Sequence, residues 1–230
     1  MYFEFFFNIL LFIIKHNYMK KIINFRFATV EKLMEVVNIK QVINDKKFVE
    51  WFNYNYKISA EEELFLKNHI NLHRLYLSYY NEQKLTVKFI VPIINKVNFY
   101  FKDVQDWYGS EISCELNNFI LKGKPDLMVA KGIYRPKTPY FFIQEHKKTI
   151  NPGGNPQYQV LAEMLAAINL NKTNKILGSF VIGRIWQFVI LEKSENENYE
   201  YFISKVFDAL DYQNLKQIYI NLQGVKFLYC

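Results

Sequence analysis

The chain has 230 residues, of which half are apolar and 18% are aromatic, and its formal net charge is +7. This length supports one sizeable hydrophobic core, and the apolar content excludes an intrinsically disordered chain. Two widely separated cysteines, Cys114 and Cys230, exclude a disulfide framework and a cysteine zinc site, so we expect a protein of the reducing cytoplasm.

The chain opens on a strongly apolar run from Tyr2 to Ile14. The run is shorter than the roughly 20 residues that span a bilayer, and it lacks the basic start and cleavage site of a signal peptide. We expect no stable membrane insertion. Because Met19 would serve as an ordinary cytoplasmic start, residues 1–18 are expected to be an upstream mis-start or a disordered apolar tail. A packed helix and a membrane-surface anchor remain open alternatives.

Helical patterns follow as far as Asn98. Residues 28–56 show short amphipathic patterns and predict a helical N-terminal extension over residues 19–58. Ser59 and Glu62 then form a capping-box signature, which begins a domain over residues 59–230. One long helix is expected to bury Phe65, Leu72, Leu75 and Tyr79, and a second to bury Leu85, Phe89, Ile93 and Val97, with a kink or break at Pro92.

Strand-like runs come next, at residues 114–121, 125–130 and 140–147, and together they predict a β-meander. Asn155 and Pro156 then supply an N-cap and a first-turn proline for another helix. Further strands are expected near residues 176–182, 185–192 and 199–204, before a C-terminal helix around residues 209–222. This order predicts an α/β fold in which helices flank both faces of a mixed β-sheet.

Three residues of these strands suggest chemistry: Asp126 in Pro125-Asp126, and Glu145 and Lys147 in Glu145-His146-Lys147. Two carboxylates can hold Mg²⁺, and a lysine can position or deprotonate the water that attacks a phosphodiester. The bare spacing is weak, because an acid two residues before a lysine also occurs at Asp45-Lys46-Lys47 and Glu82-Gln83-Lys84 in helical patterns.

Strand geometry separates the candidate from these two helical matches. Residues alternate faces along a strand, so Glu145 and Lys147 project to the same side. If the two strands form a hairpin centred between Arg135 and Pro136, Asp126 falls opposite Glu145, with the Cβ atoms about 5 Å apart. An ordinary turn cap at Asp126 and a solvated Glu145–Lys147 ion pair would explain the same residues, although the apolar strand around them favours burial.

The two elements, Pro125-Asp126 and Glu145-His146-Lys147, resemble the motif of the PD-(D/E)XK nuclease superfamily, and the predicted element order over residues 60–205 is similar to its core. The resemblance implies a restriction-endonuclease-like fold. It further implies that Asp126 and Glu145 ligate Mg²⁺ or Mn²⁺, with the His146 carbonyl as a further ligand, and that Lys147 activates water.

The resemblance also suggests additional site residues. A glutamine on the helix after the third strand often approaches the site in such nucleases, and Gln159 is preferred to Gln157 for that place. An acid from the first core helix sometimes joins the metal ligands, which makes Glu82 the candidate, against the alternative of a solvated charge at a helix end.

Positive charge is concentrated around the motif, since residues 122–148 hold seven lysines and arginines against two acids. Lys122, Lys124 and Lys148 are our candidates for phosphate contacts, while Arg135 and Lys137 could contribute further ones. Exposed lysines that prevent edge aggregation are an equal alternative. Arg184, in a turn between two strands, could also meet a phosphate, but a surface arginine is commoner there.

These observations favour a Mg²⁺- or Mn²⁺-dependent endonuclease whose partner is nucleic acid, with DNA preferred. The alternative is a binding module that keeps the nuclease fold and holds nucleic acid or protein without cleaving it. A membrane-associated protein is the third and weaker possibility. A homodimer is compatible with double-strand cutting, although no interface signature is visible in the sequence.

Overall fold

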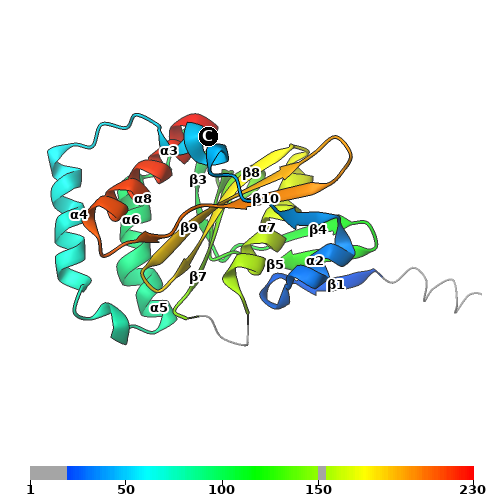
Figure 1. Cartoon of the computed structure of the whole chain (residues 1–230), viewed down its shortest axis with the longest axis horizontal. Helices are drawn as coiled ribbons and strands as arrows, with labels where there is room; N and C mark the ends of the chain where they lie inside the picture. Colours follow the sequence, from blue (N-terminus) through cyan, green and yellow to red (C-terminus); the bar gives the residue numbers. More distant parts are fainter. Residues whose placement is uncertain (1–19, 150–153) are drawn as a thin grey trace, which may run out of the picture.

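The computed structural model describes residues 20–149 and 154–230, so the expectation for residues 1–18 lies outside the described part of the chain. Figure 1 shows a large sheet with a group of helices on one side, and with α7 and a second, smaller sheet on the other. The mixed α/β architecture expected from the sequence is confirmed. Within the described residues, no helix is both long and apolar enough to cross a bilayer.

The larger sheet has the strand order β2-β10-β9-β8-β7-β6-β3, and β11 pairs with β9. The pairs β7–β8 and β2–β10 are parallel and the others are antiparallel. The strands are β2 (Ile39–Gln41), β3 (Val104–Tyr108), β6 (Leu127–Lys131), β7 (Lys137–Lys147), β8 (Lys175–Ile182), β9 (Ile185–Lys193), β10 (Tyr199–Ile203) and β11 (Phe207–Asp208). β6 and β7 thus lie inside the sheet, as strands of a buried site should.

The smaller sheet joins β1 (Lys21–Asn24), β5 (Phe119–Gly123) and β4 (Ile112–Leu116) in the order β1-β5-β4. The single strand predicted over residues 114–121 is wrong, because the chain reverses at Asn117, whose φ of 52° is the left-handed conformation that asparagine tolerates. The predicted meander is therefore wrong as well. The third strand beside β6 is β3, which the sequence did not reveal.

Residues 20–58 do contain short helices, namely α2 (Val30–Val36), α3 (Val49–Phe52) and two single 3-10 turns, Phe25–Phe27 and Asp45–Phe48. The expected extension differs from the structure in one respect, since β1 and β2 come from the same segment. β1 pairs in parallel with β5 and β2 pairs in parallel with β10. The segment is thus built into both sheets.

Helix α4 (Ala60–His73) begins with the predicted capping box, in which Glu62 N donates to Ser59 Oγ at 3.2 Å and Ser59 N donates to Glu62 Oε2 at 2.8 Å. Its expected buried face is largely wrong, because the helix ends at His73 and the residues beyond follow a different path. Leu66, His69, Ile70 and His73 are buried, whereas Leu72, Leu75 and Tyr79 are exposed.

The second helix predicted from Leu85, Phe89, Ile93 and Val97 is confirmed, and all four side chains are buried. It runs without interruption through α5 (Glu82–Leu85), a π-helical segment (Thr86–Ile90) and α6 (Val91–Val97). Pro92 lies directly after the π-helical segment, which widens the helix where the proline lacks a backbone donor, so the expected break does not occur. Figure 1 places α5 at the lower end of this helix layer.

Helices α7 (Pro156–Asn171) and α8 (Tyr212–Gly224) cover opposite faces of the larger sheet (Figure 1). The predicted N-cap of α7 is confirmed, because Asn155 Oδ1 accepts from Gln157 N at 2.9 Å and Pro156 stands in the first turn. α8 starts three residues later than expected, at its own N-cap Asp211, and continues into a π-helical turn, Val225–Tyr229.

Helix α7 packs closely on the sheet at Gly178 in β8. A Cβ atom at this position would lie 2.6 Å from Met164 Sδ and 2.9 Å from Ile143 O. We predict that Gly178→Ala lowers the free energy of unfolding by about 1–3 kcal/mol, because α7 or β7 must move to admit the methyl group.

Urea unfolding of both proteins followed by circular dichroism measures this effect. Ser179→Ala is the matched control, since its buried hydroxyl has no hydrogen-bond partner among the described residues and its loss should change stability little. Equal stability of Gly178→Ala and the wild-type protein would contradict the close packing.

Candidate active site

The backbone of β7 holds the Asp126 side chain in place. It stands directly before β6, where Leu127 pairs with Gln144 of β7. Continuing this antiparallel register by one residue brings Asp126 beside Glu145. The His146 backbone N–H donates to Asp126 Oδ2 at 2.8 Å and fixes the carboxylate there.

The register expected next to the site therefore agrees with the structure, but the expected turn does not. Lys131 pairs with Lys137, so the turn is centred near Tyr134 rather than between Arg135 and Pro136. Two register shifts between Val129 and Lys131 absorb the extra residues of β7 before the strands reach the site.

Glu145 and Lys147 project from β7 to the same side and form an ion pair, with Lys147 Nζ 2.8 Å from Glu145 Oε1. The Glu145 side chain is 1% exposed and that of Lys147 is 16% exposed. Lys147 Nζ also lies 3.4 Å from Oε1 of Glu82, at the start of α5. Glu82 thus reaches the candidate site through Lys147, and its predicted role as a metal ligand stays a prediction.

Burial is the largest single influence on the pKa values of Glu145, Asp126 and Lys147. It raises the pKa of Glu145 to about 8, and the nearby Asp126 carboxylate adds to the rise. Burial raises the pKa of Asp126 as well, against the opposing hydrogen bond from His146 N. Burial works against the charge on Lys147, but the carboxylates of Glu145, Asp126 and Glu82 together outweigh it, so the net pKa of Lys147 is raised. The lysine is therefore a firmly protonated hydrogen-bond donor.

Helix α7 brings a further acid, Glu163, that sequence reasoning missed. Glu163 is fully buried, and burial together with repulsion from Glu145 and Asp126 raises its pKa well above the ordinary range. Gln159, the predicted glutamine of this helix, lies one turn earlier and is 6% exposed. A signal was available, because Glu163 is the only charged residue between Pro156 and Asn171.

Several polar atoms on this side of the sheet have no hydrogen-bond partner among the described residues. They are Glu145 Oε2, both carboxylate oxygens of Glu163 and Gln159 Oε1, all of them buried. Unpartnered buried oxygens are costly, and a cation held by Asp126 and Glu145 would give Glu145 Oε2 a partner. The donor set, carboxylate and amide oxygens, is the one that Mg²⁺ and Mn²⁺ prefer.

Asp126 and Glu145 form a pair of carboxylates and not a complete metal-coordination site. Among the described residues, no three His, Cys, Asp or Glu side chains converge in the geometry of a metal site. Mg²⁺ commonly keeps several waters and uses only one or two protein carboxylates, so the pair Asp126 and Glu145 fits such an ion.

His146 points to the other face of β7. Its ring is fully buried, and neither ring nitrogen has a hydrogen-bond partner among the described residues. Burial lowers its pKa to about 3, with a further contribution from Lys147, so the imidazole is neutral. Its Nδ1 lies 4.0 Å from Asp126 Oδ2, too far for a hydrogen bond, so His146 holds Asp126 by the hydrogen bond from its backbone N–H.

The predicted phosphate-contacting lysines lie in different places. Lys124 is exposed two residues before Asp126, and Lys148 directly follows Lys147. Lys122 lies in the smaller sheet, where it pairs with Ser113 and Asn24.

The expected concentration of positive charge around the motif is only partly present. Arg135 lies in the β6–β7 turn and Lys137 begins β7, about 30 Å from Lys147 by the rise of a strand. Proximity in sequence misleads here because an extended hairpin carries neighbouring residues to opposite ends of the molecule.

The chain was also compared with known proteins. It matches no protein-family model and no curated protein.

Proposed function

We propose that the protein is a metal-dependent nuclease that hydrolyses phosphodiester bonds of DNA, on a fold of the restriction-endonuclease-like type. The observation that carries the proposal is the buried Glu145 carboxylate, which has Asp126 on one side, Lys147 on the other and one oxygen without a partner. A buried acid whose pKa is raised beside a second acid is typical of functional sites.

In this proposal Asp126 and Glu145 hold Mg²⁺ or Mn²⁺, with Gln159 and Glu163 lying behind them. The ion, when bound, polarises the phosphodiester and lowers the pKa of its bound water. Lys147 donates a hydrogen bond to the attacking water or to a phosphate oxygen. Because its pKa is raised, Lys147 acts as a donor and stabilises negative charge rather than taking a proton from water.

Glu82 positions Lys147 from the opposite side. Its ion pair with Lys147 leaves the ammonium group shared between a buried acid and a half-exposed one. With a metal ion held by Asp126 and Glu145, Glu82 would remain the partner that keeps Lys147 in place. Glu82 is thus expected to tune the reaction, and Asp126, Glu145 and Lys147 to be required for it.

Cleavage by the purified protein tests the proposal. Asp126→Asn, Glu145→Gln and Lys147→Ala are each expected to lower the rate of DNA cutting in Mn²⁺ by about a thousandfold, because the lost interactions are worth several kcal/mol. Gel assays with supercoiled plasmid and with single-stranded circular DNA measure the rates.

The matched controls are Asp103→Asn and Lys131→Ala, which break an ion pair of 3.3 Å at the other end of β6 and should leave cutting unchanged. Cutting that persists unchanged in the three site variants would refute the assignment. Metal-independent DNA binding without cutting in the wild-type protein would instead favour the binding module.

Thermal stability tests the metal site without relying on activity. Because the folded pKa of Glu145 lies above its ordinary value near 4.5, its contribution to stability is present at low pH and is lost as pH rises toward about 8. We predict that the melting temperature of the metal-free protein falls across this window, and that Glu145→Gln removes part of the fall.

Mn²⁺ competes with protons for the same carboxylates, so it should raise the melting temperature more at pH 8 than at pH 6. Glu145→Gln should abolish most of this shift, whereas the exposed control Glu50→Gln should retain it. A Mn²⁺ shift that is independent of pH and equal in the three proteins would count against the site.

A further inference from the structure

A cavity of about 460 Å³ opens beside the candidate active site. Its walls come from the connection between α4 and α5, from the end of β7 and from the turn between β8 and β9. The volume is within the range of about 300–1,000 Å³ that is usual for small-molecule sites.

The cavity is continuous with the catalytic strand. Lys148 in its wall follows Lys147 directly, and Gly183 N in the same wall donates to Lys147 O at 2.8 Å. Leu85 in its wall lies one turn after Glu82 in the same helix. The cavity therefore adjoins the end of the strand that carries Glu145 and Lys147, although these two side chains are not among its lining residues.

The rim of the cavity is cationic. Arg74, Lys148 and Arg184 line it. Arg184 Nε pairs with Asp208 Oδ2 at 3.2 Å, whereas Arg74 and Lys148 make no ion pair with any described residue. Two cationic side chains that line one cavity and have no ion-pair partner among the described residues favour an anionic ligand such as phosphate.

The inner wall is apolar and aromatic. It consists of Leu77, Leu85 and Leu210, with the buried ring of Tyr80 beside them. An apolar floor under a cationic rim matches a nucleotide, whose flat base can enter the cavity while its phosphate stays at the rim. A base within a duplex is stacked and paired, so only an unpaired base can enter.

The same connection carries two exposed aromatic side chains, Tyr76 at 58% exposure and Tyr79 at 84%. Exposed tyrosines next to a cationic groove provide stacking surfaces for the bases of a single strand. The expected long helix would have buried Tyr79, so this surface exists only because α4 ends at His73.

We propose that this cavity binds an unpaired nucleotide next to the phosphodiester that is cut, so that the substrate is single-stranded nucleic acid. Arg74 and Lys148 hold its phosphate, and the base lies against the leucines and Tyr80. That the bound nucleotide belongs to a substrate rests on the proposed nuclease function. The binding itself uses residues other than Asp126, Glu145 and Lys147.

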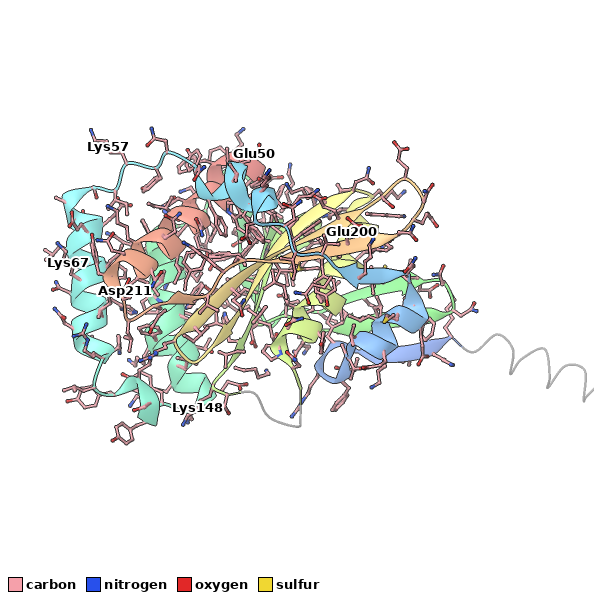
Figure 2. The ribbon with its side chains drawn as sticks, in the orientation of Figure 1. Glu50, Lys57, Lys67, Lys148, Glu200 and Asp211 are labelled. Atoms are coloured by element: carbon pink, nitrogen blue, oxygen red, sulfur yellow. The ribbon has the colours of Figure 1, made fainter. Side chains whose placement is uncertain are left out.

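Fluorescence anisotropy in EDTA, where no cleavage occurs, measures the binding of labelled 12-nucleotide oligo-dT, oligo-rU and a 12-base-pair duplex to the full chain. We expect the single strands to bind at least about fivefold more tightly than the duplex. Arg74→Ala and Lys148→Ala should each weaken single-strand binding and lower its salt slope by about 0.7. Figure 2 shows Lys57 near the top of the view and Lys148 near the bottom, which makes Lys57→Ala the control for loss of one charge.

Ser78→Trp tests the contact with the base separately from the contact with the phosphate. Ser78 is exposed on the cavity wall, so the indole would fill the cavity without removing charge. It should weaken single-strand binding by about fivefold or more and leave duplex binding unchanged. Equal binding of single strands by Ser78→Trp, Arg74→Ala and the wild-type protein, or a preference for duplex, would overturn the proposal.

The two proposals can fail separately. If single strands bind as expected but no DNA or RNA is cut in Mn²⁺, the nuclease assignment fails while the cavity assignment stands. If plasmid DNA is cut but single strands show no dependence on Arg74, Lys148 or Ser78, the cavity assignment alone fails. The oligo-dT and oligo-rU arms determine whether the sugar matters.

Discussion

The antiparallel pairing of β6 with β7 is the constraint on which the candidate site depends. Both strands lie inside an eight-stranded sheet and are covered on their two faces, and their register pairs Leu127 with Gln144 next to the site. A shift of one residue would turn Glu145 and Lys147 to the opposite face and remove Asp126 from its hydrogen bond with His146 N. The same pairing therefore stabilises the core and places the acids.

The site itself opposes folding. Glu145 and Glu163 are buried near the half-buried Asp126, and burial together with their mutual repulsion raises the pKa of the two buried acids. Among the described residues, Lys147 is the positive charge in contact with Glu145 that offsets them. Close packing of α7 against Gly178 keeps Glu163 on the sheet, so the helix cannot relax away from the repulsion. Structures keep such unfavourable groups chiefly where a ligand or a reaction uses them.

Local signals predicted much of this architecture. The capping box at Ser59, the N-cap at Asn155 and the apolar spacing from Leu85 to Val97 each depend on a few neighbouring residues, and each is confirmed. Elements whose structure depends on distant partners were predicted less well. The run 114–121 looks like one strand because its alternation is continuous, yet Asn117 reverses it to serve a separate sheet. β3 was missed since its pairing with β6 is long-range.

By itself the sequence determined the chemistry available to this protein: two acids and a lysine at strand spacing, two local caps, and a helix with a single charge at Glu163. These follow from residue type and local periodicity, which need no partner. Only the tertiary structure decided which charges meet. It separated Arg135 from Lys147, brought Glu82 to Lys147 and joined Arg74, Lys148 and Arg184 around one cavity. The reason is that burial and Coulomb interactions act through space, and the distances between strands and helices from distant parts of the chain exist only after folding.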